Sequence, residues 1–128
     1  MSLLTTSKRM EYIINLNQLK MLREYINTMS SLERKDLLKY LSTKKKYFKD
    51  IYGVSKIGVF GSFARDEQKI SSDIDIIVEF EKGRKNIHNF LNLKRYLEAE
   101  LGRNIDLGIE HSLKPLIKEK IRGQIYYA

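Results

Sequence analysis

Residues 61–75 read GSFARDEQKISSDID, and this stretch decides the fold of the 128-residue chain. It lies between two apolar runs, residues 57–60 and 74–80, which have the composition and alternation of β-strands. Because strand side chains alternate between faces, we expect Asp73 and Asp75 on the same side of the second strand. Two carboxylates close to a glycine-led turn indicate a site for a divalent metal ion and a phosphate group.

Helices and strands alternate on both sides of this stretch. Strands are expected over residues 56–60, 73–80 and 104–110, and a short helix over residues 62–67. Longer helices are expected over residues 9–29, 32–52, 87–101 and 112–126. The order α-α-β-α-β-α-β-α predicts an α/β (α+β) fold, a small mixed sheet of three or more strands flanked by helices.

Capping signals support these helix boundaries. Ser30 and Glu33 have the spacing of a capping box at the start of the second helix. Gly53 and Gly102 follow the last periodic residues of two helices, where glycine commonly ends a helix. Pro115 lies where the first turn of the last helix is predicted, a position that tolerates proline.

A third carboxylate, Asp106, lies on the predicted strand over residues 104–110. It converges with Asp73 and Asp75 if this strand lies beside the second with matching faces. Three aspartates on an open face suit two Mg²⁺ ions, which take oxygen ligands and can clamp the two oxygens of a phosphoryl displacement. Taken singly, each motif is common at turns and strand ends. Their conjunction in this order favours a catalytic site.

The glycine-led turn offers contacts for a phosphate group. Gly61 lets the backbone approach the anion, and Ser62 can donate a hydrogen bond to it. The backbone amides in the first turn of the short helix are also expected to point toward the phosphate group. Arg65 and Lys69 add positive charge nearby.

The composition of the chain excludes several classes of protein. The chain has no cysteine, which excludes disulfides and thiolate chemistry, and neither its start nor any apolar run predicts a signal peptide or a membrane span. We therefore expect a soluble, cytoplasmic protein. The net charge is +8, and Lys44-Lys45-Lys46 is the densest basic cluster. We interpret that cluster as a solvated helix face and expect no direct nucleic acid ligand. His88 and His111 have no spacing that indicates a metal site.

Together these motifs resemble the signature of the DNA polymerase β-like nucleotidyltransferases, and the compact form resembles the minimal nucleotidyltransferase (MNT) proteins. The pattern is Gly61-Ser62, ten residues, then Asp73-x-Asp75. The likeness runs from about Lys39 to the end of the chain, and four segments carry it: residues 61–65, 72–80, 102–107 and 113–115.

The resemblance implies a nucleotidyltransferase fold that uses Mg²⁺ and ATP. It implies that Asp73 and Asp75 are metal ligands and that Asp106 is a third ligand or the base that activates the attacking hydroxyl. Gly61 and Ser62, with Arg65, would hold the triphosphate. Relatives of this size pair with a HEPN-domain RNase toxin as its antitoxin, and some transfer AMP to a tyrosine of that toxin.

Two features depart from the family pattern. Asp66 stands where many relatives have glycine, and we expect it to add negative charge beside the phosphate site. Residues 1–30 have no counterpart in the shortest relatives, so we predict an N-terminal helical extension over 1–30 and a nucleotidyltransferase domain over 31–128. Three roles are open for the extension: covering an apolar face, which is the simplest, forming a homo-oligomer, or docking the partner.

Four functions follow as hypotheses. The first is transfer of AMP from ATP to a hydroxyl of a partner protein, because a chain this short has no second domain to build a pocket for a small acceptor. The second is a non-catalytic antitoxin that neutralises its partner by complex formation. The third is a small-molecule, antibiotic-type nucleotidyltransferase completed by a dimer or partner. The fourth, a nucleic-acid-binding module, depends on the net charge alone.

Overall fold

The computed structural model describes residues 15–29 and 32–128. The chain divides into two compact units, Met1–Leu32 and Glu33–Ala128. The first unit contains helix α2 (Leu16–Met29), which confirms the C-terminal part of the predicted helix over 9–29. Residues 9–14 of that prediction lie outside the described residues. The proposed boundary between an extension and a domain at residue 30 stays a prediction.

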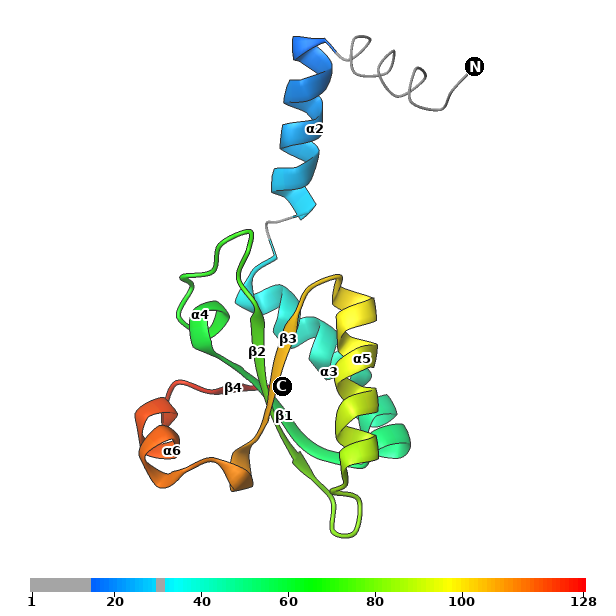
Figure 1. Ribbon diagram of the computed structural model, residues 1–128, viewed down its shortest axis with the longest axis vertical. Coiled ribbons are helices and arrows are strands. Elements are labelled where there is room, and N and C mark those ends of the chain that lie inside the picture. Colours follow the sequence, from blue (N-terminus) through cyan, green and yellow to red (C-terminus); the bar gives the residue numbers. More distant parts are fainter. Residues whose placement is uncertain (1–14, 30–31) are drawn as a thin grey trace, which may run out of the picture. The chain divides into compact units, whose positions relative to one another are not determined.

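The second unit is built on a four-stranded mixed sheet, which confirms the predicted mixed sheet of three or more strands (Figure 1). The strands are β1 (Val54–Phe60), β2 (Ile74–Phe80), β3 (Ile105–Ile109) and β4 (Tyr126–Tyr127), in the order β3-β2-β1-β4. β1 is antiparallel to both β2 and β4, whereas β2 and β3 are parallel. The connection between the parallel strands contains a helix, as parallel pairs require.

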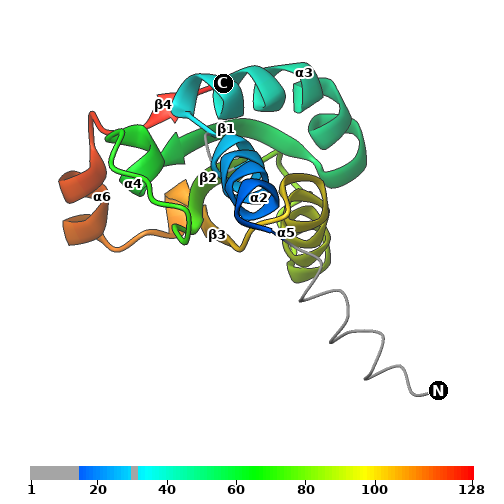
Figure 2. The same ribbon diagram turned by 90° about the horizontal axis from the view of Figure 1, so that it is seen from above.

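Two helices, α3 (Arg34–Tyr52) and α5 (Ile87–Leu101), cover one face of the sheet, and helix α6 (Pro115–Ile121) lies on the other side (Figure 2). Alternating strand residues supply the core beneath α3 and α5. The fully buried side chains of this layer are Leu37, Leu41, Phe48, Ile57, Val59, Ile74, Ile76, Val78, Leu93 and Leu97. Because this apolar set takes every second position of β1 and β2, the intervening residues face the opposite, more open side.

The predicted helix ends are largely confirmed. α5 has the predicted bounds. It is capped at its start by Asn86, whose side chain accepts a hydrogen bond from the Asn89 amide, and at its end by Gly102 in the left-handed conformation. Gly53 ends α3 in the same way. The capping box of α3 is formed by Glu33 and Asp36, not by the pair beginning at Ser30, which lies outside the described residues.

Two predicted helices are too long. The short helix α4 spans Gly61–Ala64, because Asp66 adopts a left-handed conformation with φ 56° that ends it before residue 67. The predicted helix over 112–126 is a 3₁₀ turn η1 (Glu110–Ser112) followed by α6, which ends at Ile121. The segment after Gly123, which has φ 78°, returns to the sheet as β4. No helix in the described residues is long and apolar enough to cross a membrane.

Candidate active site

Asp75 and Asp106 lie side by side on the open face of the sheet. They are register partners in the parallel pair β2 and β3, so their side chains leave neighbouring strands about 4.8 Å apart in the same direction. Burial raises the pKa of Asp75 most, and the charge of Asp106, hydrogen bonding with Asp106 and the charge of Asp73 act in the same direction, so that together they bring this pKa to about 6. The predicted convergence of Asp75 and Asp106 is therefore present in the fold.

Asp73 lies one residue before β2, because the strand begins at Ile74 rather than at the predicted residue 73. The Ile74 amide donates to the Asn104 carbonyl at 3.0 Å, and this bond fixes the start of β2 against β3. The Asp73 side chain is exposed and lines a hollow of about 420 Å³ together with Arg103. The charge of Asp73 is near enough to raise the pKa of Asp75, although the Asp73 side chain is open to solvent.

Gly61 is required by two separate features of the turn between β1 and α4. Its φ of 71° falls in the left-handed region that L side chains rarely adopt. A Cβ added there would lie 2.0 Å from Oδ2 of Asp75, so the carboxylate occupies the space that any side chain would need. The glycine-led turn and the second aspartate of the predicted motif are thus in direct contact.

Ser62 and Arg65 lie on either side of the buried part of α4. Ser62 is partly buried, and its carbonyl accepts a hydrogen bond from the Glu67 amide at 2.9 Å. Arg65 is half exposed and forms an ion pair with Glu67, with Nε 3.1 Å from Oε2. The Arg65 charge also opposes the rise in the pKa of Asp75, so this guanidinium lies within electrostatic range of the carboxylates.

Asp66 turns toward helix α3. Its carboxylate Oδ2 lies 3.3 Å from Nη1 of Arg34, which also donates to the Ala64 carbonyl at 2.6 Å. The Arg34 guanidinium lies 4.1 Å from the centre of the Tyr126 ring. The negative charge of Asp66, expected beside the phosphate site, is therefore paired with Arg34. The sequence analysis did not single out Arg34, whose contacts link α3, α4 and β4.

A second group of polar residues lies further along the same face. Lys56 forms an ion pair with Glu110 at 3.3 Å, and the Tyr127 hydroxyl donates to the other Glu110 oxygen. Burial raises the pKa of Glu110, but the hydrogen bonds from Tyr127 and Lys56 outweigh it and the pKa is lowered. Alternation along residues 104–110 could have placed Glu110 on the face of Asp106, whereas nothing in the sequence signalled Tyr127.

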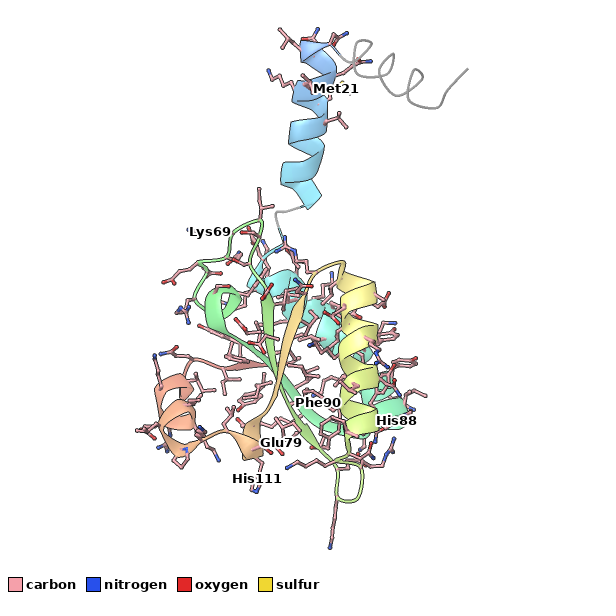
Figure 3. All side chains as sticks on the ribbon, viewed as in Figure 1. Met21, Lys69, Glu79, His88, Phe90 and His111 are labelled. Atoms are coloured by element: carbon pink, nitrogen blue, oxygen red, sulfur yellow. The ribbon has the colours of Figure 1, made fainter. Side chains whose placement is uncertain are left out.

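Figure 3 shows Glu79 and His111 together at the end of the sheet where β2 finishes. Glu79 accepts a hydrogen bond from the His111 backbone amide, so the His111 imidazole takes no part in this contact. His88 lies on α5, and its ring nitrogen contacts the Asn92 side-chain amide at 3.0 Å. Both labelled histidines lie away from the carboxylate pair (Figure 3).

The donor atoms of Asp75 and Asp106 suit a divalent cation. Both offer carboxylate oxygens, which Mg²⁺ prefers. The pKa of Asp75 is raised by burial first and then by the like charges of Asp106 and Asp73, and a bound cation would relieve that repulsion. The described residues contain no group of three or more His, Asp or Glu side chains already spaced to hold a metal ion. The pair therefore fits a metal ion, and Asp73 stands at its edge.

The chain is similar to known nucleotidyltransferases over most of its length. The family model for the nucleotidyltransferase domain matches residues 41–125. The protein adenylyltransferase MntA of Thermococcus cleftensis is 38% identical over 99 residues, which cover 77% of this chain and 99% of that protein.

Solved structures agree with the sequence matches. A structure solved as a minimal nucleotidyltransferase superposes with a TM-score of 0.58 and 29% identity, covering 75% of this chain and 96% of that one. A chain in the crystal structure of a mutant of the toxin–antitoxin pair MntA-HpeT superposes with a TM-score of 0.54 and 25% identity. That match covers 68% of this chain and 70% of the other.

Proposed function

The chain belongs to the nucleotidyltransferase domain family and is a nucleotidyltransferase, and from this premise we propose that it transfers AMP from ATP to a hydroxyl of a partner protein. The observation that carries the proposal is the contact of Asp75 with both Asp106 and Gly61. This contact joins a carboxylate pair to a glycine-led turn, which are the two parts that phosphoryl chemistry needs.

In the transfer, the acceptor oxygen attacks the α-phosphorus of ATP, the bond from that phosphorus to the bridging oxygen breaks, and pyrophosphate leaves. We assign Asp106 as the group that accepts the hydroxyl proton, because it is exposed and adjoins Asp75. Asp75 is held against the Gly61 backbone, which would keep its carboxylate in one orientation beside the turn that we assign to the phosphates.

Asp73, Asp75 and Asp106 would hold Mg²⁺, which when bound supplies neutralising charge at the reacting phosphate. Gly61 and Ser62 would contact the triphosphate through the turn that opens α4. Arg65, whose charge acts on Asp75, would exchange its ion pair with Glu67 for the phosphates.

A protein acceptor is supported by the relatives. The Thermococcus relative is a protein adenylyltransferase, and a fold neighbour belongs to a toxin–antitoxin complex. We propose that the partner here is a HEPN-domain toxin, that a tyrosine of the toxin is the acceptor, and that the chain acts as the antitoxin. The acceptor would bring its own binding surface to a domain of fewer than 100 residues, Glu33–Ala128.

The testing experiment mixes the full chain with Mg²⁺, α-labelled ATP and the product of the adjacent gene. We expect label on that product with the wild-type chain and none with Asp75→Asn. The matched control is Asp50→Asn, which removes an exposed carboxylate paired with Lys46 on the outer side of α3 and should leave labelling unchanged. A stable, inhibited complex without label would overturn the transfer reaction in favour of a non-catalytic antitoxin.

A further inference from the structure

The hollow of about 420 Å³ at Asp73 is bounded by two loops. Residues 70–73, which precede β2, form one side, and residues 102–104, between α5 and β3, form the other together with Glu98 of α5. Of the residues that line it, Asp73 alone was assigned to the metal ion, and neither Gly61 nor Ser62 is among them. The hollow therefore adjoins the carboxylate site without including the turn that we assign to the phosphates.

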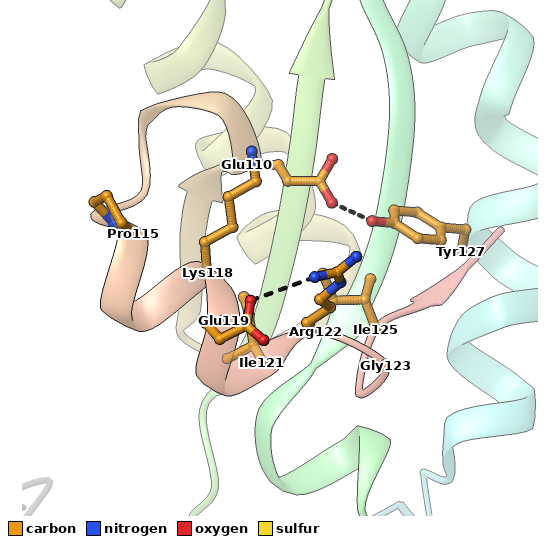
Figure 4. Close-up of a pocket in the computed structure, with 9 residues that line it drawn as sticks. All are labelled: Glu110, Pro115, Lys118, Glu119, Ile121, Arg122, Gly123, Ile125 and Tyr127. Carbon is orange, nitrogen blue, oxygen red and sulfur yellow. Dashed lines mark hydrogen bonds and ion pairs between the residues drawn. The ribbon is translucent and has the colours of Figure 1, made fainter.

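A larger pocket, of about 560 Å³, lies between the end of β3, α6 and β4 (Figure 4). It shares no lining residue with the hollow at Asp73. AMP transfer requires two substrates, ATP and the acceptor, and the two cavities are separate places on the surface. The hollow is the one of the two that includes an assigned carboxylate.

Arg103 is the cation of this hollow, and the described part of the chain gives it no counter-ion. None of the ion pairs found among the described residues includes Arg103. Its Nη1 is closed off from solvent and has no hydrogen-bond partner. A guanidinium stays charged at any physiological pH, and a poorly hydrated charge attracts an anion more strongly than a solvated one. Arg103 therefore favours an oxyanion as the ligand of the hollow.

The guanidinium of Arg103 is held against the helix that follows the glycine-led turn. Its central carbon lies 5.5 Å from the centre of the Phe63 ring, which is fully buried in α4. A cation at this distance from an aromatic face is attracted to it. Because the planar fork is already placed, binding a carboxylate to it costs little further side-chain freedom.

Both loops around the hollow are fixed by hydrogen bonds. In the loop before β2, which Lys69 marks in Figure 3, the Lys69 amide donates to Oγ of Ser72 at 2.7 Å and the Ser72 amide donates to the Lys69 carbonyl at 3.0 Å. On the other side, the Asn104 carbonyl accepts from the Ile74 amide at 3.0 Å. The hollow is thus preformed, which lowers the ordering cost of docking a partner.

The rim of the hollow has an apolar side chain beside the charge. Ile70 lines the hollow and is 61% exposed. An exposed apolar residue alone is ordinary, but an apolar contact next to an arginine without a partner is typical of surfaces that bind proteins. The guanidinium that acts on the pKa of Asp75 is that of Arg65, which we assign to the phosphates of ATP. Arg103 is left for the second substrate.

We propose that this hollow docks the acceptor protein, and that Arg103 binds a carboxylate of the acceptor close to the hydroxyl that attacks ATP. The inference rests on the proposed function and deepens it by naming a feature of the acceptor, an acidic side chain near the modified residue. The acids of the hollow have other ligands: Asp73 is assigned to Mg²⁺, and Oε2 of Glu98 accepts from the Ile105 amide at 3.5 Å.

The test measures binding of the full chain to the adjacent-gene product and, separately, to ATP with Mg²⁺, by calorimetry. Arg103→Met removes the charge and keeps an apolar stem against Phe63. It should weaken binding of the adjacent-gene product about tenfold and leave ATP binding unchanged. The matched control is Arg95→Met, which removes an exposed arginine of α5 that lines neither cavity and should bind both ligands like the wild-type chain.

A pair of variants at Ile70 keeps the test decisive if Arg103→Met does not fold, because the Ile70 side chain is exposed. Ile70→Glu and Ile70→Lys both lose the same apolar contact but place opposite charges at the rim. An acceptor that presents a carboxylate should bind Ile70→Glu at least about threefold more weakly than Ile70→Lys.

The outcomes separate the inference from the function beneath it. Unchanged binding of the adjacent-gene product by a folded Arg103→Met chain would overturn the docking assignment alone, as would equal or reversed affinities of the two Ile70 variants. Weaker ATP binding by Arg103→Met would also overturn it, because Arg103 would then be a phosphate ligand. A wild-type chain that neither binds nor labels the adjacent-gene product would overturn the proposed function, and the inference with it.

Discussion

The Asp75 carboxylate lies against the backbone of Gly61, so closely that a Cβ at the glycine would be 2.0 Å from Oδ2. This contact connects the first residue of α4, directly after β1, to the second residue of β2; the two strands are separated by thirteen residues, which include α4 and a loop. It explains why a glycine at one end of the motif and an aspartate at the other serve one site.

The substitution Gly61→Ala is expected to break the contact between the Gly61 backbone and the Asp75 carboxylate. The variant must place alanine at φ 71° and displace the carboxylate, so we expect a loss of about 2 kcal/mol in unfolding free energy and loss of AMP transfer. The control is Gly83→Ala, which has φ 82° but open space around its Cβ. Thermal denaturation should show a smaller loss for Gly83→Ala, and transfer should persist. Equal behaviour of the two variants would contradict the assigned contact.

The raised pKa of Asp75 predicts a pH dependence of stability in the metal-free chain. A carboxyl group with an ordinary value of 3.8 and a folded value of about 6 binds more protons in the folded state between these pH values. Its contribution is therefore fully present below pH 3.8 and is lost as the pH rises through about 6. Asp75→Asn should remove this part of the stability–pH profile, measured by denaturant unfolding. A variant profile that keeps the full slope over about pH 4–6 would argue against the shift.

At position 66, the glycine variant should be more stable than the alanine variant. The residue has φ 56°, which costs alanine roughly 1 kcal/mol more than glycine, and both substitutions lose the Arg34 ion pair equally. We therefore expect Asp66→Gly to be about 1 kcal/mol more stable than Asp66→Ala in chemical denaturation. The reverse order would show that the left-handed conformation is not retained.

Removing the Arg34 side chain should lower the free energy of unfolding more than removing that of its neighbour on α3, Lys35. It donates to Ala64, pairs with Asp66 and lies over the Tyr126 ring, so Arg34→Ala should cost about 1–2 kcal/mol in unfolding free energy. Lys35→Ala is the matched control, because Lys35 forms one exposed ion pair and its loss should cost well under about 1 kcal/mol. Equal melting temperatures for the two variants would refute the role of Arg34 as a tie between elements.

The sequence could predict the elements whose local signals agree with their packing. α5 has the predicted bounds because its apolar period and its Gly102 end coincide. The pairing of Asp75 with Asp106 followed from strand alternation, given that β2 and β3 lie side by side in matching register. The chemical roles of these residues remain predictions.

The parts that could not be predicted depend on distant partners. β4 contains two residues, and its order comes from pairing with β1, including the Ala128 amide bonded to the Ile57 carbonyl at 2.9 Å. A two-residue strand has no periodicity of its own, so the helix predicted over residues 112–126 includes Tyr126. The left-handed Asp66 likewise gave no signal, because aspartate is also an ordinary helix residue at the surface.

The central claim is that the Asp75–Asp106 pair performs AMP transfer to a protein, and the most direct measurement is the single-turnover rate with Asp106→Asn. The wild-type and Asp50→Asn chains should add AMP to the adjacent-gene product at the same rate, detected as a mass increase of the intact acceptor. Asp106→Asn should fold and bind ATP, yet transfer at least about a hundredfold more slowly, as expected for loss of a general base. Transfer by Asp106→Asn at the wild-type rate would contradict the account.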